Sequence, residues 1–112
     1  MSDIEEDCVT RAISFAVEED YYKISNKLYC IADLYECDRL CICCYQHLID
    51  NYYELPQIKG YEGMTIEEFA NYFPKGTYLI RCEGHLTVMQ DSIIFDLFDC
   101  RDMKITNVWR AR

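Results

Sequence analysis

Hydrophobic side chains recur at helical spacing through the first half of the chain. Behind Asp7, a residue suited to an N-cap, apolar positions repeat every three or four residues and predict a first helix. These positions are Val9, Ala12, Ile13 and Ala16. Similar stripes predict a second helix from Tyr22 to about Tyr35 and a third from about Asp38 to Asn51.

The pattern changes in the second half of the chain. Pro and Gly residues between Glu54 and Gly63 predict a loop. Thr65 and Glu68 have the spacing of a capping box and predict a short helix that ends before Pro74. Four runs rich in β-branched and aromatic residues then predict strands separated by short turns. The runs are Thr77–Cys82, His85–Gln90, Ile93–Phe98 and Ile105–Trp109.

Helices followed by a strand meander predict an α+β fold. In this fold the N-terminal helices pack on one face of a C-terminal antiparallel sheet of three to four strands. A chain of 112 residues is long enough for one core, so we expect a single domain over residues 1–112. Its helical part is expected at 1–73 and its sheet at 77–110.

The charge of the chain limits its partners. Twenty acidic residues against 11 basic ones give a net charge of -9. This field repels nucleic acid and anionic membranes and attracts basic surfaces, so we expect a basic protein partner and neither direct nucleic-acid binding nor membrane association. The acidic start is unlike a signal peptide and no apolar run could span a bilayer, which predicts a cytoplasmic protein with reduced thiols.

Half of the eight cysteines lie close together before His47. Cys37, Cys41 and Cys44 follow an i, i+4, i+7 spacing that would place them on one face of a helix. Thiolate and imidazole are preferred ligands of Zn²⁺. We therefore predict a structural zinc site formed by Cys37, Cys41, Cys44 and His47, with Cys43 as a reserve ligand.

Other interpretations of this cluster stay open. If the third helix begins near Cys41, then Cys37 comes from the preceding turn. Cys41 and Cys44 then form a pair of ligands with two residues between them. A distant thiol, Cys30 or Cys100, is then a candidate fourth ligand. Free cysteines also serve as small apolar residues of buried helices. The chain has no glutamate placed as in zinc deaminases or proteases, so a catalytic zinc is not expected.

A second set of residues predicts an alternative function. Cys8 lies near the start of the first helix, where the helix dipole favours a thiolate. If Asp91 and Ser92 form a two-residue hairpin loop, His85 and Asp96 share one face of the sheet. This arrangement resembles papain-like cysteine peptidases. The resemblance implies that Cys8 is the nucleophile, His85 the base and Asp96 the residue that orients it. No Gln or Asn precedes Cys8 to form an oxyanion hole, so we favour a protein without enzymatic activity.

The chain also resembles small acidic accessory proteins of phages and mobile elements. The resemblance lies in the cysteine pattern from Cys37 to Tyr45 and in the motifs around Cys8 and His85. Such proteins include anti-CRISPR inhibitors, toxins, antitoxins and regulators. The anti-CRISPR resemblance implies an inhibitor that docks on a basic domain of an RNA-guided nuclease in the host cytoplasm and blocks DNA loading.

An acidic run followed by tyrosines is the predicted docking surface. Three consecutive acids near a helix C-terminus oppose the helix dipole, so solvent or a partner must accommodate them. Aromatic residues beside them are typical of interfaces. The predicted partner-binding residues are Glu18, Glu19, Asp20, Tyr21 and Tyr22.

Overall fold

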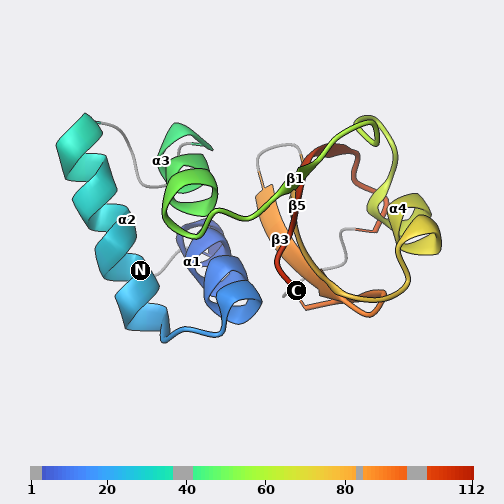
Figure 1. Ribbon diagram of the computed structural model, residues 1–112, viewed down its shortest axis with the longest axis horizontal. Coiled ribbons are helices and arrows are strands. Elements are labelled where there is room, and N and C mark those ends of the chain that lie inside the picture. Colours follow the sequence, from blue (N-terminus) through green and yellow to red (C-terminus); the bar gives the residue numbers. More distant parts are fainter. Residues whose placement is uncertain (1–3, 37–41, 83–84, 96–100) are drawn as a thin grey trace.

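The computed structural model describes residues 4–36, 42–82, 85–95 and 101–112, with side chains described from residue 9 in the first range and from residue 44 in the second. The first part of the chain is helical (Figure 1). Its helices are α1 (Ile4–Val17), α2 (Tyr21–Tyr35), α3 (Ile42–His47) and η1 (Leu48–Tyr52), which continues α3 as a π-helix. The later elements are β1 (Gln57–Ile58), α4 (Ile66–Tyr72), β2 (Thr77–Cys82), β3 (His85–Gln90), β4 (Ile93–Ile94) and β5 (Ile105–Arg110).

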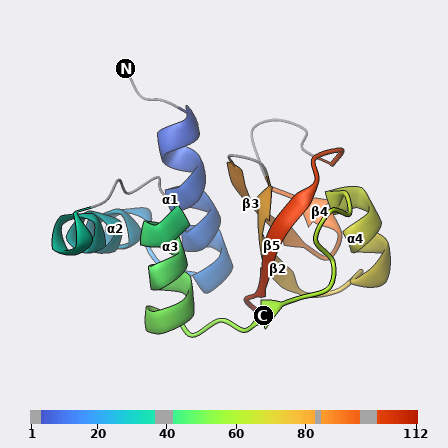
Figure 2. The same ribbon diagram turned by 90° about the horizontal axis from the view of Figure 1, so that it is seen from above.

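The described strands form one antiparallel sheet with the order β1-β5-β2-β3-β4. Helices α1, α2 and α3 lie on one side of this sheet and α4 lies on the other (Figures 1 and 2). Helix α1 lies between the sheet and α2, and it contacts β3, β2 and α2. The predicted α+β class is confirmed. Among the described helices, none combines the length and apolar character needed to cross a membrane.

The two faces of the sheet bury two separate hydrophobic clusters because successive strand residues point to opposite sides. The sheet residues that pack with α1, α2 and α3 are Leu79, Leu86, Val88 and Trp109. The sheet residues that pack with Ile66 and Phe69 of α4 are Tyr78, Ile80, Cys82, Met89, Ile105 and Val108. Because both faces of the sheet are covered, β2 and β3 are buried along nearly their whole length.

Several local predictions are confirmed. The Thr65 hydroxyl accepts a hydrogen bond from the Glu68 backbone N–H, and the Glu68 carboxylate accepts one from the Thr65 N–H, which completes the capping box. Asp91 and Ser92 form a two-residue turn with positive φ angles. Strands β2 and β3 have the predicted bounds. These features depend on residues close together in the chain.

Other features differ from the predictions. Helix α1 begins at Ile4, so the prediction of Asp7 as its N-cap is wrong. Acidic residues are favourable in the first helical turn, which lets the segment before Asp7 extend the helix. The predicted loop contains β1, a fifth strand that pairs with β5. Such a short strand is defined by its distant partner and not by a pattern of its own. The first three helices share one face of the sheet, whereas α4 covers the opposite face.

Candidate functional site

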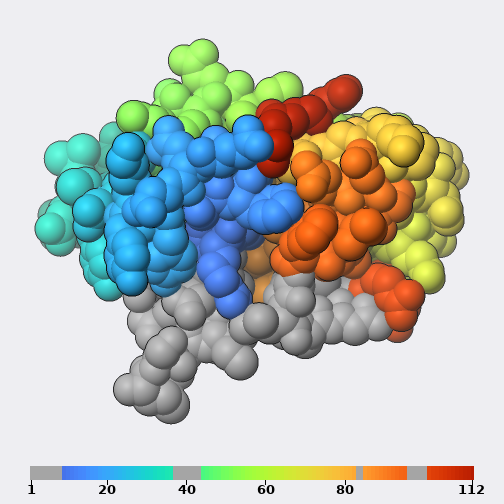
Figure 3. Space-filling view, turned by 90° about the horizontal axis from the view of Figure 1, so that it is seen from below, coloured from blue at the N-terminus to red at the C-terminus, as the bar shows by residue number. Residues whose placement is uncertain are grey.

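Helix α1, which carries Cys8, runs alongside β3, which begins with His85 (Figure 2). The Phe15 ring stacks on Phe95 with centroids 4.6 Å apart, and the Phe95 N–H donates to the Val88 carbonyl at 3.0 Å. Figure 3 shows the end of α1 against the β3–β4 hairpin. Position 15 of the helix is therefore level with position 88 of the strand.

This alignment allows the positions of Cys8 along α1 and His85 along β3 to be compared. Arg112 joins the C-terminal end of α1 to the end of the sheet where β3 finishes, because its Nε donates to the Ala16 carbonyl and its own carbonyl accepts from Thr77. Going back seven residues along the helix or three along the strand covers about 10 Å in either element. The backbone positions of Cys8 and His85 thus lie at the same end of the molecule.

The His85 side chain does not face α1. Alternation along β3 directs Leu86 and Val88 toward α1 and assigns His85 to the row of Met89, which packs with α4. His85 is buried, with 8% of its surface exposed. The hairpin required by the predicted alignment of His85 with Asp96 is confirmed, but Asp96 and the Cys8 side chain lie outside the described part. The structure thus brings the two segments together without showing a catalytic dyad.

The cysteine cluster is described only in part. Cys37 and Cys41 lie outside the described residues, and Cys43 lies in α3 without a described side chain. Cys44 is fully buried in the helical cluster, and its thiol donates to the Leu28 carbonyl at 3.5 Å. It therefore serves as a small apolar residue of the core.

The other described member of the predicted zinc site, the half-buried His47, is the last residue of α3. Its Nδ1 is 2.9 Å from Nδ2 of Asn51, and its ring is 4.9 Å from that of Tyr35. Across the described residues, no three His, Cys, Asp or Glu side chains are grouped as metal ligands. Of the two candidates for a distant fourth ligand, Cys30 is exposed on α2, whereas Cys100 lies outside the described residues. The zinc site stays a prediction.

The acidic run from Glu18 to Asp20 has structural roles that its sequence did not reveal. Helix α1 ends before it, and Asp20 caps α2 by accepting a hydrogen bond from the Tyr22 N–H at 3.0 Å. Glu18 pairs with Nη1 of Arg112 at 2.7 Å. The acids thus lie in the turn between two helices, where Asp20 is favourable to the dipole of α2.

Glu19 joins this turn to η1 and α2. Its carboxylate accepts a hydrogen bond from the Tyr53 hydroxyl at 2.7 Å and pairs with Nζ of Lys27 at 3.5 Å. The hydrogen bond from Tyr53, more than the nearby lysine charges, lowers the pKa of Glu19. Burial and the same hydrogen bond raise the pKa of Tyr53.

Two tyrosines of α2, Tyr22 and Tyr29, lie on one exposed surface, and of these only Tyr22 was predicted. The other predicted tyrosine, Tyr21, begins α2 and contacts the Tyr22 ring edge-to-face. Tyr22, Asn26, Tyr29 and Asp33 lie in one line along the helix, hereafter the α2 stripe, because they are spaced four, three and four residues apart. Tyr22 and Tyr29 are 72% and 52% exposed. The signal that identifies this stripe is the spacing of the two tyrosines opposite Ile24 and Leu28, the buried residues of α2.

Comparisons with protein-family models, with curated proteins and with solved structures gave no match to this chain.

Proposed function

We propose that this protein binds a basic protein partner through the α2 stripe and acts by occupying that partner's surface. The observation that carries the proposal is the exposure of Tyr22 and Tyr29 on the outermost helix (Figure 1). Tyrosine offers a large amphipathic surface with few rotatable bonds and is enriched in protein interfaces. Folding requires only the opposite side of α2 to be apolar.

The charges around the stripe support a basic partner. Asp33 is exposed within the stripe, and Asp20 and Glu36 are exposed at the two ends of α2. Arginine pairs with carboxylates and stacks on tyrosine rings, so an arginine-rich surface suits this combination. The net charge of -9 would steer such a partner toward the protein. The anti-CRISPR resemblance makes an RNA-guided nuclease the first partner to test.

The test compares two exposed tyrosine surfaces. Affinity capture from host lysate identifies basic partners, and calorimetry with a purified partner then gives the dissociation constant. Replacing Tyr22 and Tyr29 by Ala should weaken binding about 30-fold, the effect of losing one interfacial hot spot. Tyr72→Ala is the matched control because Tyr72, 65% exposed, lies on α4 beyond the sheet. Equal effects of the two changes, or capture of acidic partners alone, would refute the proposal.

A cysteine hydrolase is the second candidate, favoured by the common level of Cys8 and His85 at one end of α1 and β3. In this function the Cys8 thiol would attack an acyl carbon and displace its leaving group, and water would then hydrolyse the acyl-enzyme. His85, which alternation assigns to the α4 side of β3, would have to reach the α1 side to accept the thiol proton. Iodoacetamide labelling followed by peptide mapping tests it, with the exposed thiol of Cys30 as internal control. We expect His85→Gln to slow the labelling of Cys8 and leave that of Cys30 unchanged. Labelling of Cys8 no faster than that of Cys30 argues against catalysis.

Structural zinc remains a separate part of the proposal and is supported by the cysteine spacing alone. Metal analysis of protein purified without chelators should find about one zinc per chain if Cys37, Cys41, Cys44 and His47 bind it. Zinc binding would require the Cys44 thiol to leave the Leu28 carbonyl. A zinc content near zero contradicts this part and leaves the α2 stripe untouched.

A further inference from the structure

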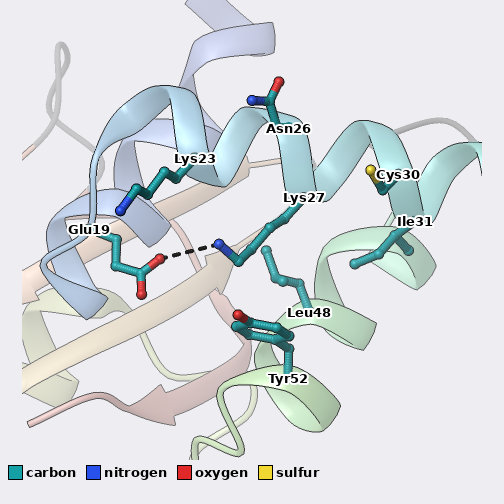
Figure 4. Close-up of a pocket in the computed structure, with 8 residues that line it drawn as sticks. All are labelled: Glu19, Lys23, Asn26, Lys27, Cys30, Ile31, Leu48 and Tyr52. Carbon is teal, nitrogen blue, oxygen red and sulfur yellow. Dashed lines mark hydrogen bonds and ion pairs between the residues drawn. The ribbon is translucent and has the colours of Figure 1, made fainter.

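A cavity of about 660 Å³ lies between α2 and η1, on the side of α2 that turns toward η1 (Figure 4). Its volume is within the range of sites that bind small molecules. The lining residues are Glu19, Lys23, Asn26, Lys27, Cys30, Ile31, Leu48 and Tyr52. The cavity is distinct from the α2 stripe, although Asn26 belongs to both.

The charged side chains that line this cavity carry a net positive charge. Lys23 and Lys27 lie one turn apart on α2, and both project toward Glu19 (Figure 4). Glu19 is engaged by Tyr53 and Lys27, whereas within the described part of the chain the Lys23 ammonium takes part in no ion pair. Two ammonium groups against one carboxylate leave one net positive charge, on a protein whose total charge is -9.

The remaining wall of the cavity is apolar. Ile31 and Leu48 contribute aliphatic surface, and Tyr52 contributes an aromatic face that Lys27 covers at 5.2 Å from the ring centroid. Asn26 lies at the rim, and its side chain points away from Glu19, Leu48 and Tyr52 (Figure 4). A ligand that suits this lining has an apolar body and one anionic head.

The geometry points to a binding site for a small organic carboxylate, whose head group pairs with Lys23 and whose apolar body packs on Ile31, Leu48 and Tyr52. A monoanion matches the single net positive charge. A phosphate dianion would exceed that charge. This site is independent of the proposed protein interface, so either can fail without the other.

Phenylbutyrate is the probe, and its neutral analogue phenylbutanamide tests the need for charge. Titration followed by amide NMR should give saturable shifts in α2 and η1 with phenylbutyrate, weaker with the neutral analogue and weaker at high salt. Lys23→Glu should weaken binding about tenfold by reversing the net charge of the cavity. The variant should fold, because an acid in the first turn of α2 is favourable to the helix dipole.

Lys75→Glu is the control, since it makes the same charge change at an exposed site outside the cavity. Binding lost in Lys23→Glu and retained in Lys75→Glu supports the site. Equal losses in the two variants, or wild-type shifts that do not saturate or fall outside α2 and η1, would overturn it.

Discussion

Helices α1 and α2 are neighbours of similar length, yet their surroundings differ. Helix α1 lies between the sheet and α2, and its buried residues occupy much of its circumference. They include Val9, Thr10, Ala12, Ile13 and Ala16. Helix α2 buries only Ile24 and Leu28 and presents Tyr22 and Tyr29 to solvent.

The difference separates residues that serve folding from residues available for binding. Small and β-branched residues of α1 allow it to pack closely against two layers. The outward residues of α2 are larger than solubility requires, since Lys or Glu would serve a solvated face equally well. Packing explains the residues of α1, whereas the packing of α2 leaves Tyr22 and Tyr29 exposed for the interface proposed above.

The largest expected effect on stability comes from a substitution that disrupts the packing of α1. Ile13→Ala should lower the free energy of unfolding by about 3 kcal/mol, because Ile13 is fully buried and its removal leaves a cavity. Leu34→Ala on α2 removes an exposed side chain and should change stability by less than about 0.5 kcal/mol. Urea denaturation of both variants measures the contrast. Similar losses would show that α2 is as tightly integrated as α1.

A smaller effect concerns the start of α2. Asp20→Ala should cost about 1 kcal/mol, because it removes the side chain that accepts from the Tyr22 N–H. Asp33→Ala is the matched variant, with an exposed aspartate on the same helix and no cap to lose. The melting temperature, measured by thermal unfolding, should fall for Asp20→Ala only. An equal shift for Asp33→Ala would mean that Asp20 acts through charge and not as a cap.

The smallest expected effect concerns Glu19, which links the two helices to η1. Its pKa is lower in the folded protein than its ordinary value of 4.5, so its charged form adds stability above that pH. This contribution is lost as the pH falls through the folded-state pKa. The stability difference between wild type and Glu19→Gln should therefore be present at neutral pH and vanish in acid. Tyr53→Phe should reduce the pH dependence by removing its main cause. A pH-independent difference would contradict this role.

Features that depend on neighbouring residues could be predicted from the sequence. The capping box at Thr65, the two-residue turn at Asp91 and the bounds of β2 and β3 depend on residues within a short stretch of chain. Such features can be predicted without knowledge of the fold because the interacting groups are linked by a short stretch of chain.

The candidate surfaces could be predicted only in part. Tyr22 was expected at an interface, but Tyr29 joins it only once the buried side of α2 is known. The acids Glu18 and Glu19 were expected to face a partner, and the fold instead pairs them with Arg112, Tyr53 and Lys27. The cavity between α2 and η1 required both helices to be placed.

The sequence by itself determined the α+β class, the order of helices α1 to α4 and strands β2 to β5, the capping box at Thr65 and the turn at Asp91. Tertiary structure alone decided that α4 covers the second face of the sheet, that β1 joins β5, and that the Trp109 indole donates to Asp50 of η1 at 2.8 Å. The reason is physical. Periodicity tells which side of an element is apolar, whereas only the packed chain determines which distant surface meets that side.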